Sequence, residues 1–203
     1  MEINFKNNVE YNINPRDIYS KSGFKLLEQN CHMQLNLATE DSVDGRISDE
    51  YDIIPIDKAN FEELLRCFKT TFRQSEDRWL LDRSDEELED YFENTVIKSP
   101  FQLINDASIA IKHDKQIITF SIVRESHGQA NGHLWIMGVH PNYRNQGIGF
   151  TLVNHVKKQL IKNDFKTCSL NVDITNIPAI RLYEKHGFRE DWVQTNYTWN
   201  RNK

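Results

Sequence analysis

One segment combines a proline, an arginine and two glycines directly before an amphipathic helix, and this combination can bind an anion. The segment is Val139-His140-Pro141-Asn142-Tyr143-Arg144-Asn145-Gln146-Gly147-Ile148-Gly149-Phe150. The first turn of a helix has unpaired backbone N–H groups and a partial positive charge, and glycines let a ligand approach that backbone closely. Arg144 adds a full positive charge. The segment therefore predicts a phosphate-type site, although a glycine turn needed only for its backbone angles is the alternative.

The spacing does not match two other phosphate-binding motifs. A P-loop ends in Gly-Lys-Ser or Gly-Lys-Thr, and the dinucleotide fingerprint needs a third glycine with an acidic residue further along. Neither pattern follows Gly149. A different kind of ligand is therefore indicated.

Apolar periodicity predicts the elements that position this segment. Two helices are expected first, one capped by Asn60 with Glu63 and one capped by Ser84 with Glu87, joined by a polar loop over residues 73–83. Strands and helices should then follow in the order strand 107–111, strand 117–123, strand 133–139, helix 148–161, strand 167–172, helix 176–187 and strand 188–199. This order predicts a mixed α/β domain.

The N-terminal region contains a possible internal repeat. Residues 18–25, Ile-Tyr-Ser-Lys-Ser-Gly-Phe-Lys, align without gaps on residues 182–189, Leu-Tyr-Glu-Lys-His-Gly-Phe-Arg, and an alternating segment follows each. A helix end, a glycine cap and a strand form a common pattern, so chance is one explanation. The other is that residues 1–45 are an N-terminal extension left from a truncated first copy of the domain at 46–203.

Composition limits the classes of protein. The 203 residues, 38% hydrophobic and 27% charged, suit one globular domain. A net charge of -5 argues against nucleic-acid binding and slightly favours a cationic acceptor. Three dispersed cysteines give no disulfide framework and no metal spacing. The sequence has no apolar run of about 18 residues, so we expect no membrane partner and a cytoplasmic location.

Two signatures resemble the GNAT (general N-acetyltransferase) superfamily. Arg144-x-x-Gly147-x-Gly149 resembles the Arg/Gln-x-x-Gly-x-Gly/Ala signature, placed after a Val-x-Pro turn as in that family. Residues 176–188 resemble the second signature, Asn-x-x-Ala-x-x-x-Tyr-x-x-x-Gly-Phe. With the element order, the resemblance covers about residues 51–199. It implies a mixed α/β fold whose central, mostly antiparallel twisted sheet is splayed at its fourth strand and carries helices on both faces.

The resemblance implies acetyl-CoA as co-substrate, without a metal. Backbone N–H groups of the glycine turn would hold the pyrophosphate, supported by the charge of Arg144; these residues are Gln146, Gly147, Ile148, Gly149 and Phe150. The end of the fourth strand would pair with the pantetheine arm through Met137, Gly138 and Val139, and Asn176 would lie beside it.

Acetyl transfer needs an acid for the departing sulfur and a neutral amine. The resemblance places Tyr183 near the sulfur as the acid; the alternative is a core aromatic at helical spacing from Ala179 and Leu182. Because an alkylamine has a pKa near 10.4, only about one molecule in two thousand is neutral at pH 7. The fourth strand lacks the carboxylate that often serves as base. Glu125 and His133 are the candidates, unless both are solvent-facing turn residues or water removes the proton.

The resulting hypothesis is an N-acetyltransferase that moves an acetyl group from acetyl-CoA to an amine of a small molecule or peptide by direct transfer. In this family the loop at 73–83, with Glu76, Asp77, Arg78 and Trp79, and the last strand would select the acceptor. A catalytically weak acyl-CoA-binding regulatory or interaction module is the alternative. A third hypothesis is that the N-terminal segment pairs with a second copy to form a homodimer.

Overall fold

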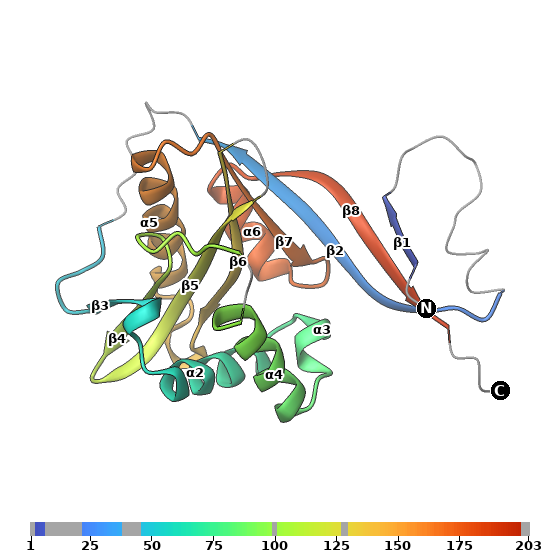
Figure 1. Ribbon diagram of the computed structural model, residues 1–203, viewed down its shortest axis with the longest axis horizontal. Coiled ribbons are helices and arrows are strands. Elements are labelled where there is room, and N and C mark those ends of the chain that lie inside the picture. Colours follow the sequence, from blue (N-terminus) through green and yellow to red (C-terminus); the bar gives the residue numbers. More distant parts are fainter. Residues whose placement is uncertain (1–2, 7–21, 38–45, 99–100, 127–129, 200–203) are drawn as a thin grey trace.

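A single sheet organises the computed structural model, which describes residues 3–6, 22–37, 46–98, 101–126 and 130–199. In this part of the chain eight strands follow the order β1-β8-β2-β7-β6-β5-β4-β3 (Figure 1). Neighbouring strands run antiparallel, apart from the parallel pair β6 and β7. The strands are β1 (Ile3–Lys6), β2 (Lys25–Asn36), β3 (Asp52–Pro55), β4 (Ile109–His113), β5 (Gln116–Ser126), β6 (Asn131–Val139), β7 (Thr167–Asp173) and β8 (Arg189–Thr198).

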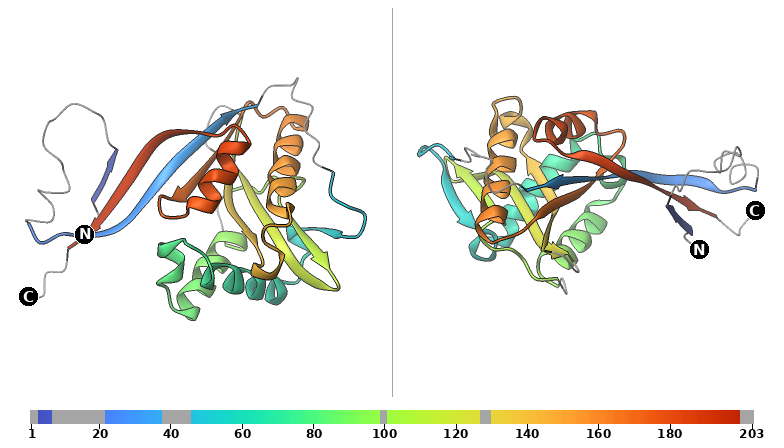
Figure 2. Two further views of the ribbon diagram at one scale, coloured as in Figure 1. Left: turned by 180° about the vertical axis from the view of Figure 1, so that it is seen from behind. Right: turned by 90° about the horizontal axis from the view of Figure 1, so that it is seen from above.

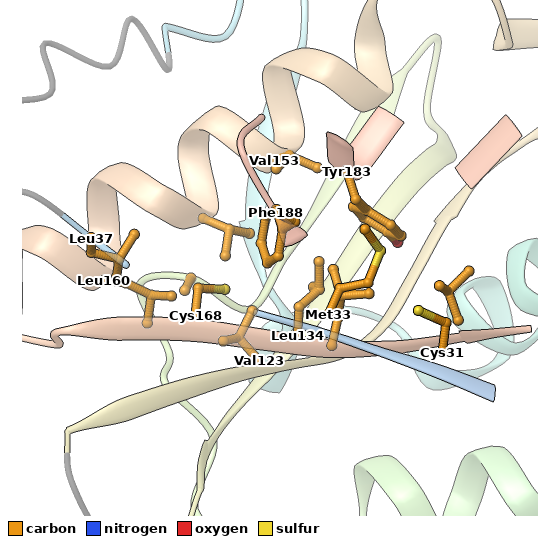
Figure 3. Packing of buried hydrophobic residues seen from close by; sticks show 14 residues of the cluster. Cys31, Met33, Leu37, Val123, Leu134, Val153, Leu160, Cys168, Tyr183 and Phe188 are labelled. Atoms are coloured by element: carbon orange, nitrogen blue, oxygen red, sulfur yellow. The ribbon is translucent and has the colours of Figure 1, made fainter. Parts of the chain in front are cut away.

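Helices cover both faces of the central strands, as Figures 1 and 2 show. On one face α2 and α4 pack on β5 around Phe68, Phe92 and Phe120. On the other face α5 and α6 pack on β2, β6 and β7, and Figure 3 shows part of this core. The helices are α2 (Phe61–Arg73), α3 (Arg78–Leu81), α4 (Asp85–Val96), α5 (Ile148–Lys162) and α6 (Ile177–Lys185). The mixed α/β fold with helices on both faces is confirmed.

The sheet opens at its fourth strand counted from residue 46, as predicted. β6 and β7 pair from Asn131↔Thr167 to Leu134↔Leu170 and no further. At the same place the register between β6 and β5 shifts, which leaves Trp135 without an opposite residue on β5. An extra residue of this kind bends a strand and increases its twist. The second half of β6 therefore diverges from β7, and a gap opens between them.

The N-terminal segment is built into the sheet. β2 lies between β7 and β8 and pairs antiparallel with both. It supplies the buried side chains of Cys31 and Met33 to the core on the α5 side (Figure 3). Part of the predicted extension thus completes the sheet of residues 46–203. Its origin as a truncated first copy stays a hypothesis, because residues 18–21 of the apparent repeat lie outside the described residues.

Local sequence signals account for most element boundaries. The Asn60 side chain accepts from the Glu63 N–H at 3.0 Å, and Ser84 and Glu87 form a reciprocal capping box. The predicted loop at 73–83 differs, because it contains the short helix α3, which is too brief for a helical period to register. No helix in the described part of the chain combines the length and the apolar character that crossing a bilayer requires.

Candidate active site

The gap between the diverging halves of β6 and β7 holds a cavity of about 350 Å³. Its walls come from β2, the α2–α3 loop, α4, β6, β7, α6 and β8. They bring together four residues that the sequence singled out for catalysis or cofactor binding, namely His133, Met137, Asn176 and Tyr183. Residues of the second signature and of the end of the fourth strand therefore lie around the same cavity.

The turn before α5 leaves backbone N–H groups available to a ligand. Asn145 and Gly147 both have positive φ, 60° and 81°, on either side of Gln146. Successive N–H groups in a turn of this kind form an anion-binding concavity. No side chain caps α5, although side chains cap α2, α3, α4 and α6. The free N–H groups and the open space around Gly147, where an added Cβ would meet nothing within 4 Å, fit a diphosphate.

This turn lies next to the cavity. A Cβ added at Gly149 would meet Met137 Cε, Val139 Cγ2 and Leu182 Cδ2, each at 3.5 Å. Met137 also lines the cavity. A ligand whose phosphates bind at the turn would therefore reach the cavity along β6. Phe150, the last residue predicted for the cradle, is 44% exposed and its ring packs on His186 with centroids 4.1 Å apart.

The exposed edge of β6 can pair with an extended ligand. His140 N–H donates to Ile118 O on β5 at 2.7 Å. Because polar groups of an antiparallel strand alternate in direction, those of Met137 and Val139 face the opposite, open edge. Gly138 faces β5, where its carbonyl accepts from the Thr119 hydroxyl at 2.7 Å. The edge next to the gap thus offers main-chain groups for amides of a pantetheine arm.

Arg144 is directed toward protein carbonyls. Its guanidinium donates to Thr71 O at 2.8 Å, to Gln74 O, and to Val139 O at 3.2 Å. Thr71 lies in the last turn of α2, where carbonyls lack helical partners and the helix dipole is negative. Arg144 therefore joins the phosphate-type turn to the end of α2 and to β6. Its contact with a phosphate stays a prediction.

Tyr183 comes from α6 and points into the same site. The side chain is 8% exposed and packs edge-on against Phe188, with centroids 5.8 Å apart (Figure 3). Burial, with the nearby Cys168 and Asp77, raises the pKa of the phenol above its ordinary value. The hydroxyl therefore keeps its proton at neutral pH, which a general acid needs, and the raised pKa at the same time makes it a weaker proton donor. Asn176 caps α6 by accepting from Ala179 N–H at 3.3 Å, which fixes where the helix starts.

His133 lines the cavity on β6, and its ring has structural partners. Its Nδ1 lies 2.8 Å from Ser169 Oγ, and the ring stacks with His32 at 6.4 Å between centroids. Burial, with the charges of His32 and Arg124, lowers the pKa of His133 to about 4. An imidazole with that pKa is neutral at pH 7 and is a weak proton acceptor, because general bases work best with a pKa near the operating pH.

The structure does not bring Glu125 to this cavity. Glu125 is exposed at the end of β5 and lines a separate depression with Leu103 and Asn163. In the segment 73–83, Asp77 and Trp79 line the cavity, while Glu76 and Arg78 are exposed. Burial, with the charges of Asp173 and Glu28, raises the pKa of Asp77 to about 6.

Two cavity carboxylates have no counterpart among the candidates drawn from the sequence. Asp173 ends β7 and is 4% exposed, and Glu28 comes from β2. The first could have been suspected because it precedes the Asn176 signature, but the second depends on where β2 enters the sheet. Among the described residues, no group of three or more His, Cys, Asp or Glu side chains is arranged to hold a metal ion.

Comparison with known proteins identifies the family. The Acetyltransferase (GNAT) family profile matches residues 61–188, a range that includes β6, the turn before α5, and α6. The chain belongs to this family. It is similar to the ribosomal protein bS18-alanine N-acetyltransferase of Escherichia coli (strain K12), with 39% identity over 64 residues, 32% of this chain and 43% of that protein. The chain thus matches less than half the length of this relative.

Solved structures show the same fold. A GCN5-related N-acetyltransferase from Sphaerobacter thermophilus has a TM-score of 0.65 at 13% identity, covering 90% of this chain and 55% of that one. The PaiA N-acetyltransferase from Thermoplasma acidophilum, in complex with coenzyme A, has a TM-score of 0.55 at 18% identity, covering 73% of this chain and 98% of that one. At these identities the likeness concerns the fold.

Proposed function

We propose that this protein is an N-acetyltransferase that moves the acetyl group of acetyl-CoA to an amine of a small molecule or peptide. One observation carries the proposal: the uncapped turn before α5 leads along the open edge of β6 to a cavity that contains Tyr183 and a carboxylate with a raised pKa. Family membership supports the activity, and the name of the Escherichia coli relative supports a peptide amine as one acceptor class.

The residues present fit acetyl-CoA, which supplies an activated acyl thioester. The N–H groups of residues 146–150 would bind its pyrophosphate, and the open edge at Met137 and Val139 would bind the pantetheine amides. An N–H group on that edge would also polarise the thioester carbonyl. Tyr183 would give its proton to the departing sulfur.

Direct transfer from the thioester to the amine agrees with the absence of a thiol among the residues that line the cavity. Cys31, Cys67 and Cys168, the free cysteines within the described ranges, are buried in the core. Burial raises the pKa of Cys67 and of Cys168 to about 12. A thiol with that pKa is a poor nucleophile at pH 7. Free thiols also agree with the cytoplasmic location that we propose.

Amine-dependent release of free coenzyme A thiol from acetyl-CoA tests the proposal. We expect turnover with a panel of primary amines and N-terminal-alanine peptides, and a fall of about 10²–10⁴-fold in kcat for Tyr183→Phe, the usual contribution of a positioned proton donor. The affinity for acetyl-CoA should stay nearly unchanged, because the ring and its packing remain. No turnover with any amine would favour the acyl-CoA-binding module, and full activity of the variant would remove Tyr183 as the acid.

A further inference from the structure

Three carboxylates from distant parts of the chain line the cavity beside Tyr183. They are Glu28 on β2, Asp77 before α3 and Asp173 at the end of β7. None of them forms an ion pair with a described Lys or Arg, and the residues that line the cavity include neither type. A cavity with three carboxylates and no built-in cation is complementary to a positively charged ligand.

Hydrogen bonds hold these carboxylates in place. The Thr175 hydroxyl lies 2.7 Å from Asp173 Oδ1 and 2.9 Å from Glu76 O, which ties the end of β7 to the residue before Asp77. Asp77 Oδ1 accepts from Leu80 N–H at 3.0 Å and so caps α3. The α3 helix contacts β2, which carries Glu28. The arrangement is therefore a property of the fold, fixed by three separate elements.

A second observation points to a ligand at this place. The Tyr183 side chain is more than nine-tenths buried and lines the same cavity, yet no described residue makes a hydrogen bond to its hydroxyl. The hydroxyl oxygen is not enclosed by protein atoms and is open to the cavity. It is therefore available to hydrogen-bond to a molecule bound there.

Aromatic side chains form one wall of the cavity, and the other walls include polar residues such as Asn30, Asn171 and Gln194. Trp79 and Tyr91 meet edge to face with centroids 5.0 Å apart, and Trp135 continues this wall on β6. Arg83 covers Trp79 at 4.4 Å and Arg124 covers Trp135 at 4.2 Å, so these rings have less area left for a ligand cation and offer mainly apolar contact. The volume of about 350 Å³ has room for a small alkylamine beside the thioester.

We propose that the acceptor is a linear alkylamine with at least two amino groups, an inference that rests on the proposed function. Asp77 receives a proton from the reacting ammonium, and Glu28 with Asp173 binds the second ammonium. The methylene groups between them lie along the wall formed by Trp79, Tyr91 and Trp135. An N-terminal-alanine peptide, by contrast, has one ammonium and a branched backbone.

The proton balance assigns each group one task. The reacting nitrogen enters as an ammonium and ends as an amide, so it loses two protons while its bond to the acetyl carbon forms and the carbon–sulfur bond breaks. One proton goes to Asp77 and then to solvent. Tyr183 gives its own proton to the departing sulfur, and the second proton of the nitrogen restores the Tyr183 hydroxyl.

Titration behaviour favours Asp77 over His133 as the proton acceptor. Burial, with the charges of Asp173 and Glu28, raises the pKa of Asp77 to about 6, whereas the pKa of His133 is lowered to about 4. A base with a pKa closer to 7 accepts a proton more effectively at neutral pH. The other two carboxylates therefore contribute to the basicity of Asp77 as well as to ligand binding.

Paired measurements with 1,4-diaminobutane and 1-aminobutane, which have equal chain length, test this proposal. Binding to the protein saturated with coenzyme A is measured by calorimetry, and kcat/KM is measured with acetyl-CoA. We expect the diamine to be favoured by about tenfold or more, the factor that corresponds to 1.4 kcal/mol. Glu28→Gln should reduce that ratio by about tenfold, while Asp191→Asn, which removes an exposed carboxylate of β8 outside the cavity, should preserve it.

The two readouts separate this inference from the proposed function. Diamine preference in binding without transfer to any amine would support the cation-binding role of the carboxylates and contradict the proposed function. Transfer to both amines with equal kcat/KM, or a stronger preference for an N-terminal-alanine peptide, would overturn the inference and leave the proposed function standing. A ratio that Glu28→Gln leaves unchanged would also overturn it.

Discussion

At the scale of residues, the chemistry depends on a carboxyl group that the fold makes unusually basic. The pKa of Asp77 is raised to about 6 by burial and by the charges of Asp173 and Glu28, against the opposing hydrogen bond from Leu80. The ionised form of such a group is disfavoured in the native state but accepts protons well near neutral pH. This one property leads to two measurable effects, one on activity and one on stability.

The effect on activity is a loss of kcat/KM in acid. Asp77 must be ionised to accept a proton, so kcat/KM should fall about tenfold for each pH unit below 6. Asp77→Asn should remove this limb of the profile together with most of the activity, as a pH–rate series would show. A wild-type profile that is flat between pH 5 and 7 would exclude Asp77 as the base. The titratable groups that share the cavity with Asp77 are Glu28, Tyr91, His133, Asp173 and Tyr183.

The effect on stability has the opposite sign from that of an ordinary salt-bridged aspartate. The folded pKa of about 6 exceeds the reference value of 3.8, so the native state binds the proton more tightly than the unfolded state. Ionised Asp77 therefore lowers the free energy of unfolding above pH 6, and this loss disappears as the pH falls below 3.8. Asp77→Asn, which can still cap α3, should raise the Tm at pH 8 and change it little at pH 4. An equal shift at both pH values would contradict the raised pKa.

Motif residues could be predicted from the sequence, but the base could not. Tyr183, Asn176 and Gly147 lie at fixed spacings in two local signatures. Tyr183 and Asn176 line the cavity, and Gly147 lies in the turn before α5. The raised pKa of Asp77 depends first on burial and then on two carboxylates that are distant in sequence. Local spacing carries no information about such a charge environment, which arises only when β2, β7 and α3 meet.

At the scale of elements, Arg144 links the cofactor turn to the acceptor loop. It donates to carbonyls of Thr71 and Gln74 at the end of α2, directly before the loop that carries Asp77 and Trp79. Hydrogen bonds of a charged donor to these carbonyls contribute about 1.5–3 kcal/mol each at most. Arg144 is thus a positioning residue for the acceptor site.

Replacing Arg144 tests this link. Arg144→Lys keeps the charge but cannot make three bonds in a planar fork, so we expect the KM for the amine to rise more than the dissociation constant of acetyl-CoA. Arg181→Lys, an exposed position on α6, serves as the matched control. Separate titrations of each substrate provide the measurement. A change confined to acetyl-CoA binding would indicate instead that Arg144 contacts the phosphates.

The contact between β6 and α5 also makes a specific prediction. A Cβ at Gly132 would lie 2.4 Å from Leu160 Cδ2, whereas one at Gly149 would meet its neighbours at 3.5 Å. Gly132→Ala should therefore lower the free energy of unfolding by about 1–3 kcal/mol, the usual cost of overpacking, and Gly149→Ala should cost much less. Denaturant unfolding of both variants checks this. Equal costs would show that Leu160 moves aside freely.

Most elements could be predicted because their signals are local. Helix caps, apolar periodicity and the proline after β6 define α2, α4, α5 and α6 within a few residues. The helix α3 escaped prediction because a single turn has no period. The neighbours of β2 in the sheet could not be predicted for another reason. The alternation of apolar residues determines which face of a strand is buried but does not determine which strands lie beside it.

At the scale of the whole molecule, β2 makes the N-terminal segment part of the domain. Deleting residues 1–37 would remove β1 and β2, which are both neighbours of β8, and would expose one edge of β7. It would also remove Met33, which is 2% exposed, from the core. We expect the shortened protein to lack a cooperative unfolding transition. Deleting residues 1–21 keeps β2 and should preserve cooperative unfolding. If the protein that lacks residues 1–37 unfolded at the wild-type temperature, the N-terminal segment would be dispensable for the stability of the fold.

The outer part of the sheet is the place where a homodimer would form. β1, β8 and the first half of β2 extend away from the helices (Figure 2), and Leu26, Leu27 and Trp199 are 52%, 40% and 40% exposed there. Because β2 is paired on both sides, a dimer would use the face of this region, not an edge of β2. Light scattering should give twice 24.0 kDa for a dimer, and the monomer mass would argue against it.

Thermal unfolding with and without acetyl-CoA tests whether the turn before α5 is the acetyl-CoA site of an acetyltransferase. At about a hundred times its dissociation constant the ligand should add roughly 2.7 kcal/mol to the free energy of unfolding. Gly147→Asn and Gly147→Asp place comparable side chains at φ 81° and differ in charge. We predict a clear stabilisation of the wild type and a larger loss of it with aspartate than with asparagine. No stabilisation of the wild type would show that the turn does not bind acetyl-CoA and is a purely structural feature.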